Sequence, residues 1–291
     1  MNRTTIDIGG PVSVLEYGGA GPLAVCVHGL EGSAYNWSLI ADDLTKTHRV
    51  IAPDLVGFGY TEPAGRDVTV EANARLVADV IDHYGGPALL IGNSMGGLIS
   101  ILAAGQYPDR VSALVLVDPA GPVAEWSRLK ARTALTLGAS MIPGIGPAIV
   151  RKYRAKRTPE EGVMESYEFV AADPTVVPAA AFADALEIAE LRRNQQWSPD
   201  ALANASRSIA PYVLIKERFL QALHKVTQPT LLLHGTADAV VQRETATWMA
   251  RQRPDWSVAY LDGVGHVPMI ESPATMMEVF RTWERSLLQR S

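Results

Sequence analysis

One short segment of the sequence combines a nucleophile with the turn that would expose it. Residues 92–96, Gly-Asn-Ser-Met-Gly, follow the apolar run Ala88–Ile91 and precede a helical pattern. A sharp turn from strand to helix leaves little room two positions before and after the serine, and glycine meets that demand. The hydroxyl would lie at a helix N-terminus, which favours negative charge. We therefore expect Ser94 to be a nucleophile rather than the capping residue of a packing turn.

A serine hydroxyl reacts only when a base takes its proton and a carboxylate orients that base. Three histidines follow Ser94 in the chain. His234 lies inside an apolar run, which indicates a core or strand-end residue, and His224 lies in a helical pattern, which indicates a surface residue. His266 lies in a glycine-containing loop after the run Ser257–Leu261, and loops at strand ends collect functional residues. We expect His266 to be the base.

Two aspartates compete for the role of the acid. Asp238 follows the run Thr230–His234 and precedes His266, in the chain order serine, acid, histidine that this kind of turn predicts. Asp118 ends the preceding apolar run and remains the alternative, either assisting or replacing Asp238. Asp54 comes too early in the chain, and we interpret it as a residue that bonds turn amides.

Acyl transfer also needs donors for the developing oxyanion. The first expected donor is the backbone N–H of Met95, the residue after the nucleophile. The second is the backbone N–H of Leu30, in the glycine-containing loop His28–Gly32 after an apolar run. We expect His28 to brace this loop by hydrogen bonds rather than to act as a second base.

Short apolar runs must position these residues. Between them lie helical patterns, and this alternation is typical of a mostly parallel sheet with helices on both faces. Val12–Tyr17 alternates in polarity and is expected to be an antiparallel entry strand. The other expected strands are Leu23–His28, Arg49–Leu55, Ala88–Gly92, Val111–Val117, Thr230–His234 and Ser257–Leu261.

The alternation stops at Pro119 and resumes at Pro229. We expect a core of residues 1–120 and 227–291, with residues 121–226 as a helical cap. The basic run Arg151–Arg157 is interpreted as a solvated helix face, in preference to an anion or membrane contact. Apolar cap residues would either bind a hydrophobic substrate or form the cap's own small core; they are Leu135, Leu137, Met141, Ile142 and Phe169.

Composition excludes several classes of protein. The 291 residues are 47% hydrophobic with a net charge of -5, which excludes a disordered chain. Its one cysteine, Cys26, excludes an internal disulfide. A pI near 5.7 argues against nucleic-acid binding, and no run is long enough for a signal peptide or an integral membrane segment. We expect a cytoplasmic protein; the sequence leaves its oligomeric state open.

The motifs together resemble the α/β-hydrolase family. They are HGLEGSAYNW at 28–37, PDLVGFG at 53–59, GNSMGG at 92–97, HGTAD at 234–238 and GVGHVPMIESP at 263–273. The resemblance implies a mostly parallel eight-stranded sheet with a helical cap inserted after strand 6. It also carries over Ser94, Asp238 and His266 as nucleophile, acid and base.

The expected activity is that of a serine hydrolase that cleaves a carboxylic ester of a small, hydrophobic molecule through an acyl-enzyme on Ser94, without a metal or organic cofactor. Two alternatives are enzymes with the same residues: a C–C bond hydrolase acting on a ring-cleavage product, to whose elbow GNSMGG is similar, and a cofactor-free perhydrolase. A fourth hypothesis is a ligand receptor that retains the three residues but turns over very slowly.

Overall fold

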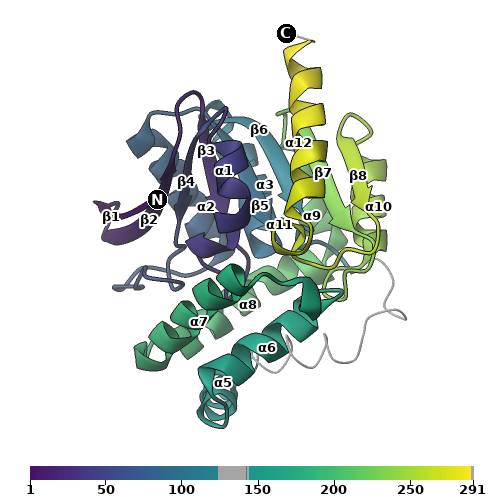
Figure 1. Ribbon diagram of the computed structural model, residues 1–291. Coiled ribbons are helices and arrows are strands. Elements are labelled where there is room, and N and C mark those ends of the chain that lie inside the picture. Colours follow the sequence, from purple (N-terminus) through teal and green to yellow (C-terminus); the bar gives the residue numbers. More distant parts are fainter. Residues whose placement is uncertain (124–141, 143, 290–291) are drawn as a thin grey trace.

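The computed structural model describes residues 1–123, 142 and 144–289, and a single eight-stranded sheet lies at its centre (Figure 1). The strand order is β1-β2-β4-β3-β5-β6-β7-β8. β1 and β2 are antiparallel to their neighbours, and the strands from β4 to β8 run parallel. The strands are β1 (Asn2–Asp7), β2 (Pro11–Gly18), β3 (Leu23–Val27), β4 (Arg49–Pro53), β5 (Ala88–Asn93), β6 (Val111–Val117), β7 (Thr230–Gly235) and β8 (Ser257–Leu261).

Both faces of the sheet are covered, as consecutive apolar residues predict. In β3, Val25 and Val27 pack into the hydrophobic cluster on one face, whereas Ala24 and Cys26 pack into the cluster on the other. The first face carries α2 (Val70–Tyr84), α3 (Met95–Gln106) and α10 (Arg243–Gln252), and the second carries α1 (Ser38–Leu44) and α12 (Pro273–Leu288). Shorter helices are η1 (Ala34–Trp37), η2 (Pro108–Arg110) and α11 (Pro268–Glu271).

The sheet matches the predicted fold class, but β1 was missed among the individual runs. Asn2–Asp7 forms an edge strand whose residues are exposed or only half-buried. It pairs with β2 along its whole length, from Asn2 opposite Glu16 to Asp7 opposite Pro11. A strand with neither face fully buried lacks the apolar run that identifies buried strands.

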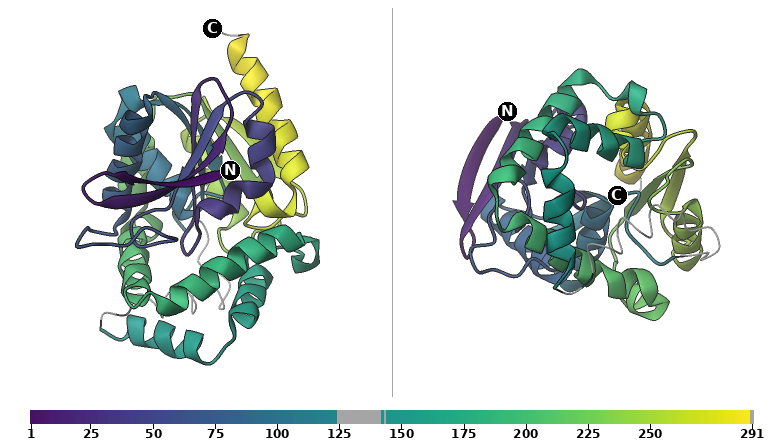
Figure 2. Two further views of the ribbon diagram at one scale, coloured as in Figure 1. Left: turned by 60° about the vertical axis from the view of Figure 1, so that its left-hand side comes forward. Right: turned by 90° about the horizontal axis from the view of Figure 1, so that it is seen from below.

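Helices between β6 and β7, where a helical cap was predicted, form a layer at one end of the sheet (Figures 1 and 2). Its described helices are α5 (Gly146–Ala155), α6 (Pro159–Val170), η4 (Pro174–Val176), α7 (Ala179–Asn194), α8 (Ser198–Leu214) and α9 (Lys216–Leu223). The part nearest β7 shares the main core, because Ala205, Phe219 and Leu223 join the cluster of α2 and α3. A division into domains at residues 120 and 227 stays a prediction.

The apolar residues predicted to bind substrate or to form the core of the cap differ in how far they are exposed. Ile142 is exposed and Phe169 is half-buried. Leu135, Leu137 and Met141 lie outside the described residues. Among the helices that the structure describes, none is both long enough and apolar enough to cross a bilayer.

Candidate active site

Ser94 occupies a strained turn between β5 and α3. Its φ of 55° and ψ of -119° lie in a region that residues with a Cβ rarely adopt. The turn is fixed on both sides, because Ser94 N–H donates to Val117 O at 3.0 Å and Ser94 O accepts from Ala120 N–H at 2.9 Å. The serine is therefore held at the N-terminus of α3 by the end of the neighbouring strand.

The two glycines of the motif are there because the turn is crowded. A Cβ on Gly92 would lie 2.4 Å from Gly96 O, and a Cβ on Gly96 would lie 2.1 Å from Val27 O. Both obstacles are backbone atoms, which cannot swing aside as a flexible side chain can. The predicted steric reason for glycine at these two positions is confirmed.

His266 lies in the loop between β8 and α11. Its Nδ1 is 2.7 Å from Oδ2 of Asp238. The loop is tied to the serine turn, since Asn93 Nδ2 donates to His266 O at 3.0 Å and to Val117 O at 3.1 Å. The residue before Ser94 thus holds the main chain of His266 next to the elbow.

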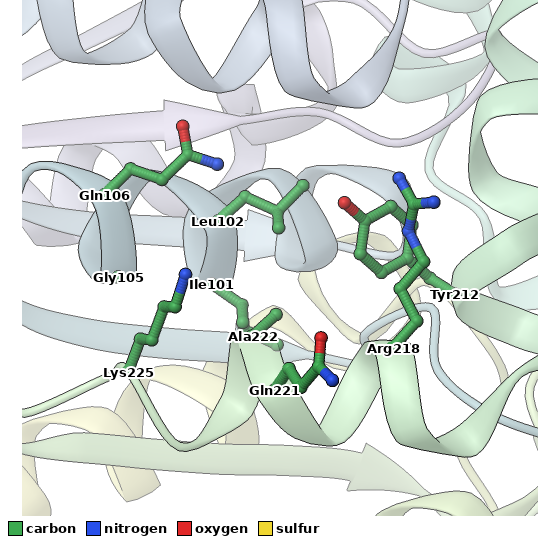
Figure 3. Close-up of a pocket in the computed structure, with 9 residues that line it drawn as sticks. All are labelled: Ile101, Leu102, Gly105, Gln106, Tyr212, Arg218, Gln221, Ala222 and Lys225. Carbon is green, nitrogen blue, oxygen red and sulfur yellow. The ribbon is translucent and has the colours of Figure 1, made fainter.

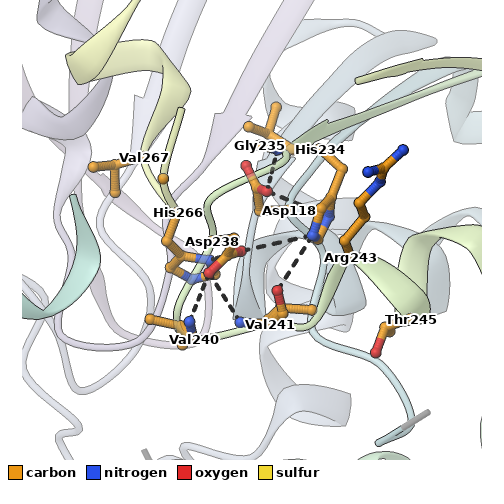
Figure 4. Close-up of polar contacts among 12 residues, drawn as sticks. Asp118, His234, Gly235, Asp238, Val240, Val241, Arg243, Thr245, His266 and Val267 are labelled. Atoms are coloured by element: carbon orange, nitrogen blue, oxygen red, sulfur yellow. Dashed lines mark hydrogen bonds and ion pairs between the residues drawn. The ribbon is translucent and has the colours of Figure 1, made fainter. Parts of the chain in front are cut away.

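Asp238 lies between two histidines, as Figure 4 shows. Its Oδ1 accepts from the N–H groups of Val240 at 2.7 Å and Val241 at 3.0 Å. Burial by itself would raise the pKa of this carboxyl group. The charge and hydrogen bond of His266, together with His234 and the Val240 N–H, outweigh burial and lower the pKa below its usual value. Asp238 is therefore ionised and faces the imidazole of His266.

Asp118, the alternative acid, faces His234 and Asp238, whereas the carboxylate that bonds to His266 is that of Asp238. It is fully buried, its φ is 44°, and its Oδ1 accepts from Gly235 N–H at 2.8 Å. Burial and the nearby charge of Asp238 raise its pKa well above the usual value. His234 is buried, as predicted, with Nδ1 3.3 Å from Asp118 Oδ1 and Nε2 3.9 Å from Asp238 Oδ2. The two aspartates therefore differ in acidity, and Asp118 holds its proton to a higher pH than Asp238 does.

Among the described residues, Asp118, His234 and Asp238 form a group whose side chains could hold a metal ion. Atoms of Asp118, His234 and Asp238 lie within 4.8 Å of one another. Both oxygens of Asp238 and one of Asp118 already accept hydrogen bonds. Only Asp118 Oδ2 and His234 Nδ1 in this group lack a hydrogen-bond partner. Two ligand atoms are fewer than the four that a structural zinc site uses.

The loop after β3 forms a tight turn over residues 29–32, here called loop 29–32. Gly29 O accepts from His28 Nδ1 at 2.7 Å and from Gly32 N–H at 3.0 Å. His28 Nε2 accepts from Leu55 N–H at 3.1 Å, so the buried ring is neutral with its proton on Nδ1. Burial lowers the pKa of His28, which agrees with this tautomer. His28 braces the loop as predicted.

These bonds orient the expected second oxyanion donor. The N–H and C=O of one trans peptide point in opposite directions. Because Gly29 O is held on one side, the N–H of Leu30 on the same peptide points to the other. The loop lies beside the nucleophile, since a Cβ on Gly29 would be 3.2 Å from Ser94 Cβ.

The comparisons with known proteins agree with this architecture. The model of the alpha/beta hydrolase family matches residues 24–279. The chain belongs to the alpha/beta hydrolase family. Lipase 1 of Psychrobacter immobilis is 29% identical over 279 residues, covering 93% of this chain and 78% of that protein. The 2-hydroxy-6-oxo-2,4-heptadienoate hydrolase of Pseudomonas putida is 31% identical over 241 residues, covering 78% and 76%.

Solved structures share the fold of this alpha/beta hydrolase. A putative lipase from Acinetobacter baumannii superposes with a TM-score of 0.79 at 24% identity, covering all of this chain and 93% of that one. The family and the relatives make the protein a hydrolase. They do not specify its substrate.

Sequence reasoning missed two residues that this hydrolase uses to hold its histidine loop. Asn93 was only a variable position of the serine motif. Glu271 lies in the quoted segment 263–273, but it received no role. Its carboxylate accepts from Gly265 N–H at 3.1 Å and Val267 N–H at 3.3 Å, on either side of His266. Polar residues within a recognised motif were the available signal for both.

Asp54 has the structural role that was predicted for it. Its Oδ1 accepts from Ala34 N–H at 2.8 Å, and its Oδ2 accepts from Tyr60 N–H at 3.1 Å. Arg3, from the missed strand β1, also donates to Oδ2 at 2.8 Å. The aspartate joins two turns beside the site and contacts neither Asp238 nor His266 by a hydrogen bond or ion pair among the described residues.

Figure 3 shows the residues that line a surface hollow of the hydrolase. The hollow opens beside the C-terminal half of α3, whereas Ser94 precedes the N-terminus of that helix. Arg218 and Tyr212 on its wall both bond to Glu71. The hollow contains none of the expected catalytic residues; its lining is Ile101, Leu102, Gly105, Gln106, Tyr212, Arg218, Gln221, Ala222 and Lys225.

Proposed function

We propose that this hydrolase cleaves a carboxylic ester of a small, hydrophobic molecule through an acyl-enzyme on Ser94. The observation that carries the proposal is the tie between two motifs far apart in the sequence. Asn93 bonds the main chain of His266, and His266 bonds the ionised Asp238. These contacts support a mechanism in which serine, imidazole and carboxylate act in the order that acyl transfer uses.

In the proposed reaction, Ser94 Oγ attacks the ester carbonyl carbon while Nε2 of His266 takes the hydroxyl proton. Asp238 keeps the other ring proton on Nδ1 and stabilises the imidazolium that forms. The N–H groups of Leu30 and Met95 bind the oxyanion. The C–O bond then breaks, and His266 gives its proton to the departing alcohol. Water, deprotonated by His266, then attacks the acyl carbon. The bond to Ser94 Oγ breaks, His266 returns the proton to this oxygen, and the acid is released.

A C–C bond hydrolase is the second proposal, favoured by the 31% identity to the heptadienoate hydrolase. A dienoate carries a carboxylate and needs a cationic partner. Two half-buried arginines of the cap that lie near the site, Arg154 and Arg192, are already paired with Glu31 and with carbonyls of loop 29–32. A neutral ester makes no such demand, and this difference supports the ester as the first proposal.

The test combines labelling with turnover. A fluorophosphonate probe should label the wild type and should not label Ser94→Ala. It should label His266→Ala more slowly than the wild type. Both variants should keep the wild-type melting temperature and lose turnover of a p-nitrophenyl ester by several powers of ten. If a ring-cleavage dienoate is turned over faster than the ester, the C–C bond hydrolase becomes the better proposal. If peracid formation is faster than ester hydrolysis, the perhydrolase becomes the better proposal. Labelling with only very slow turnover of all three would favour a receptor, and no labelling at all would refute the nucleophile.

A further inference from the structure

Two arginines of the helical insertion reach loop 29–32. Arg192, near the end of α7, donates to Glu31 O and lies 3.4 Å from Gly32 O. Arg154, in α5, bonds to the carboxylate of Glu31 and donates through Nη1 to Ser198 Oγ at 3.0 Å. Two helices from the cap therefore hold both the main chain and the side chain of Glu31. The prediction of a solvated basic run fits the exposed Lys152 and Lys156, but not Arg154.

These groups are charged at neutral pH. Burial lowers the pKa of Arg192 to about 10, with the charge of Arg154 acting in the same direction and that of Glu31 opposing it. Desolvation would raise the pKa of Glu31, whose side chain is 42% exposed, but the charges of Arg154 and Arg192 outweigh it and lower that pKa. Hydrogen bonds in which one partner is ionised are roughly twice as strong as neutral ones. Each of these contacts to loop 29–32 therefore has a charged donor.

Loop 29–32 needs such a restraint. Glu31 has a φ of 57°, a left-handed conformation that is unfavourable for a residue with a Cβ. Strain of this kind persists only where the surroundings hold it. His28 and Gly32 hold the carbonyl of Gly29 at the start of the turn. Arg192 holds the carbonyls of Glu31 and Gly32 at its end.

We infer that Arg192 and Arg154 are positioning residues for the oxyanion donor at Leu30. They act through loop 29–32 and do not touch the substrate. Without them, the strained turn at Glu31 relaxes, and the N–H of Leu30 turns away from the place where the oxyanion forms. The inference rests on the proposed function, because it assumes that Leu30 provides an oxyanion donor.

The experiment uses the full chain with the substitutions Arg192→Gln, Arg192→Lys and Arg154→Gln. The matched control is Arg151→Gln, which removes an exposed α5 arginine that pairs with Asp200 at 3.3 Å instead of with the loop. Steady-state turnover of a neutral p-nitrophenyl ester gives kcat and KM separately. Active sites are counted by fluorophosphonate labelling, and folding is followed by thermal melting.

Removing an oxyanion donor outright typically costs about 100- to 1,000-fold in turnover. A donor that is misplaced rather than removed costs less, so Arg192→Gln should lower kcat by about 10- to 100-fold with KM changed less than about threefold. Arg192→Lys should recover part of the loss, because an ammonium can still donate to the carbonyls. Arg154→Gln should have a smaller effect of the same kind, and Arg151→Gln should have none.

A second measurement separates positioning from general stability. An aryl boronic acid forms a tetrahedral adduct with the serine and needs the same donors as the oxyanion. Its inhibition constant should rise in Arg192→Gln by the same factor as kcat/KM falls. A lower melting temperature with unchanged kcat per labelled site would overturn the inference, as would a change in KM alone. If the wild type shows neither labelling at Ser94 nor ester turnover, the proposed function itself has failed, and this inference fails with it.

Discussion

Two aspartates of similar burial are predicted to respond very differently to the same isosteric change. In Asp238→Asn, the amide oxygen can still accept from Val240 and Val241 N–H. The NH2 group then faces Nδ1 of His266, where Oδ2 now lies 2.7 Å away. Two donors cannot share one hydrogen bond, so the imidazole moves its proton to Nε2. It can then no longer accept the proton of Ser94.

The loss that follows from a wrong histidine tautomer is large. In serine hydrolases with this arrangement, the change from aspartate to asparagine lowers kcat about 10,000-fold. At about 1.36 kcal/mol for each factor of ten, this is about 5.4 kcal/mol of transition-state stabilisation. Folding should be nearly unaffected, since the hydrogen bonds to the two backbone N–H groups remain.

Asp118→Asn should be almost silent in the same assay. Burial and the charge of Asp238 raise the pKa of Asp118 and favour its protonated form, and an amide reproduces the shape and the hydrogen-bonding groups of a protonated carboxyl group. The amide oxygen can accept from Gly235 N–H at the present 2.8 Å, and the NH2 group can donate to Asp238. We expect kcat to change by less than about threefold.

The assay is kcat for a p-nitrophenyl ester, divided by the number of sites that a fluorophosphonate labels, for both variants and the wild type. His224→Gln, which changes an exposed residue at the end of α9, is a control for an unrelated substitution. If Asp118→Asn is more damaging than Asp238→Asn, the acid has been assigned to the wrong residue. Equal losses in both variants would mean that the two carboxyl groups act as one unit.

Two further predictions concern stability. Gly96→Ala places a Cβ 2.1 Å from Val27 O and should lower the free energy of unfolding, measured in urea, by about 1–3 kcal/mol or more. Gly162→Ala, in α6, places a Cβ with no atom beyond the neighbouring backbone of its own helix within 4 Å and should raise that free energy by up to about 1 kcal/mol. Equal effects of the two substitutions would contradict the crowding at Gly96. The raised pKa of Asp118 means that the folded state holds its proton to higher pH than the unfolded state, so the wild type should lose stability as pH rises from 3.8 through the folded pKa. Asp118→Asn lacks this loss, and its melting temperature relative to wild type should increase with pH; a constant difference would show that Asp118 is ionised.

The fold was predictable where burial imposes a pattern. Strands that are covered on both faces are apolar at every position, and β3 is buried throughout. The edge strand β1 carries no such pattern, because solvent can hydrate its side chains while its pairing with β2 keeps it extended. Its existence depends on a partner strand, which local sequence does not reveal.

The candidate site was predictable to the extent that each residue lies in a loop that follows a strand. Parallel strands bring such loops to one edge of the sheet, so Ser94, Asp238 and His266 could be placed together from chain order alone. The interactions that orient them could not be predicted this way. The bond from Asn93 to His266 O and those from Glu271 to the same loop join residues with no shared local pattern.

The helical insertion contacts both loops that the proposed mechanism uses, and no motif in its sequence predicts where it lies. It contacts the site on two sides: Arg192 and Arg154 reach loop 29–32, while Val170 O accepts from His266 N–H at 2.8 Å and Ala172 N–H donates to Glu271 at 2.8 Å. One layer of helices therefore bonds both to the loop expected to hold the oxyanion and to the loop expected to carry the base. A change in how this layer lies on the sheet would move both loops together, so substitutions in α6 and α7 should alter kcat without altering any residue that touches the ester.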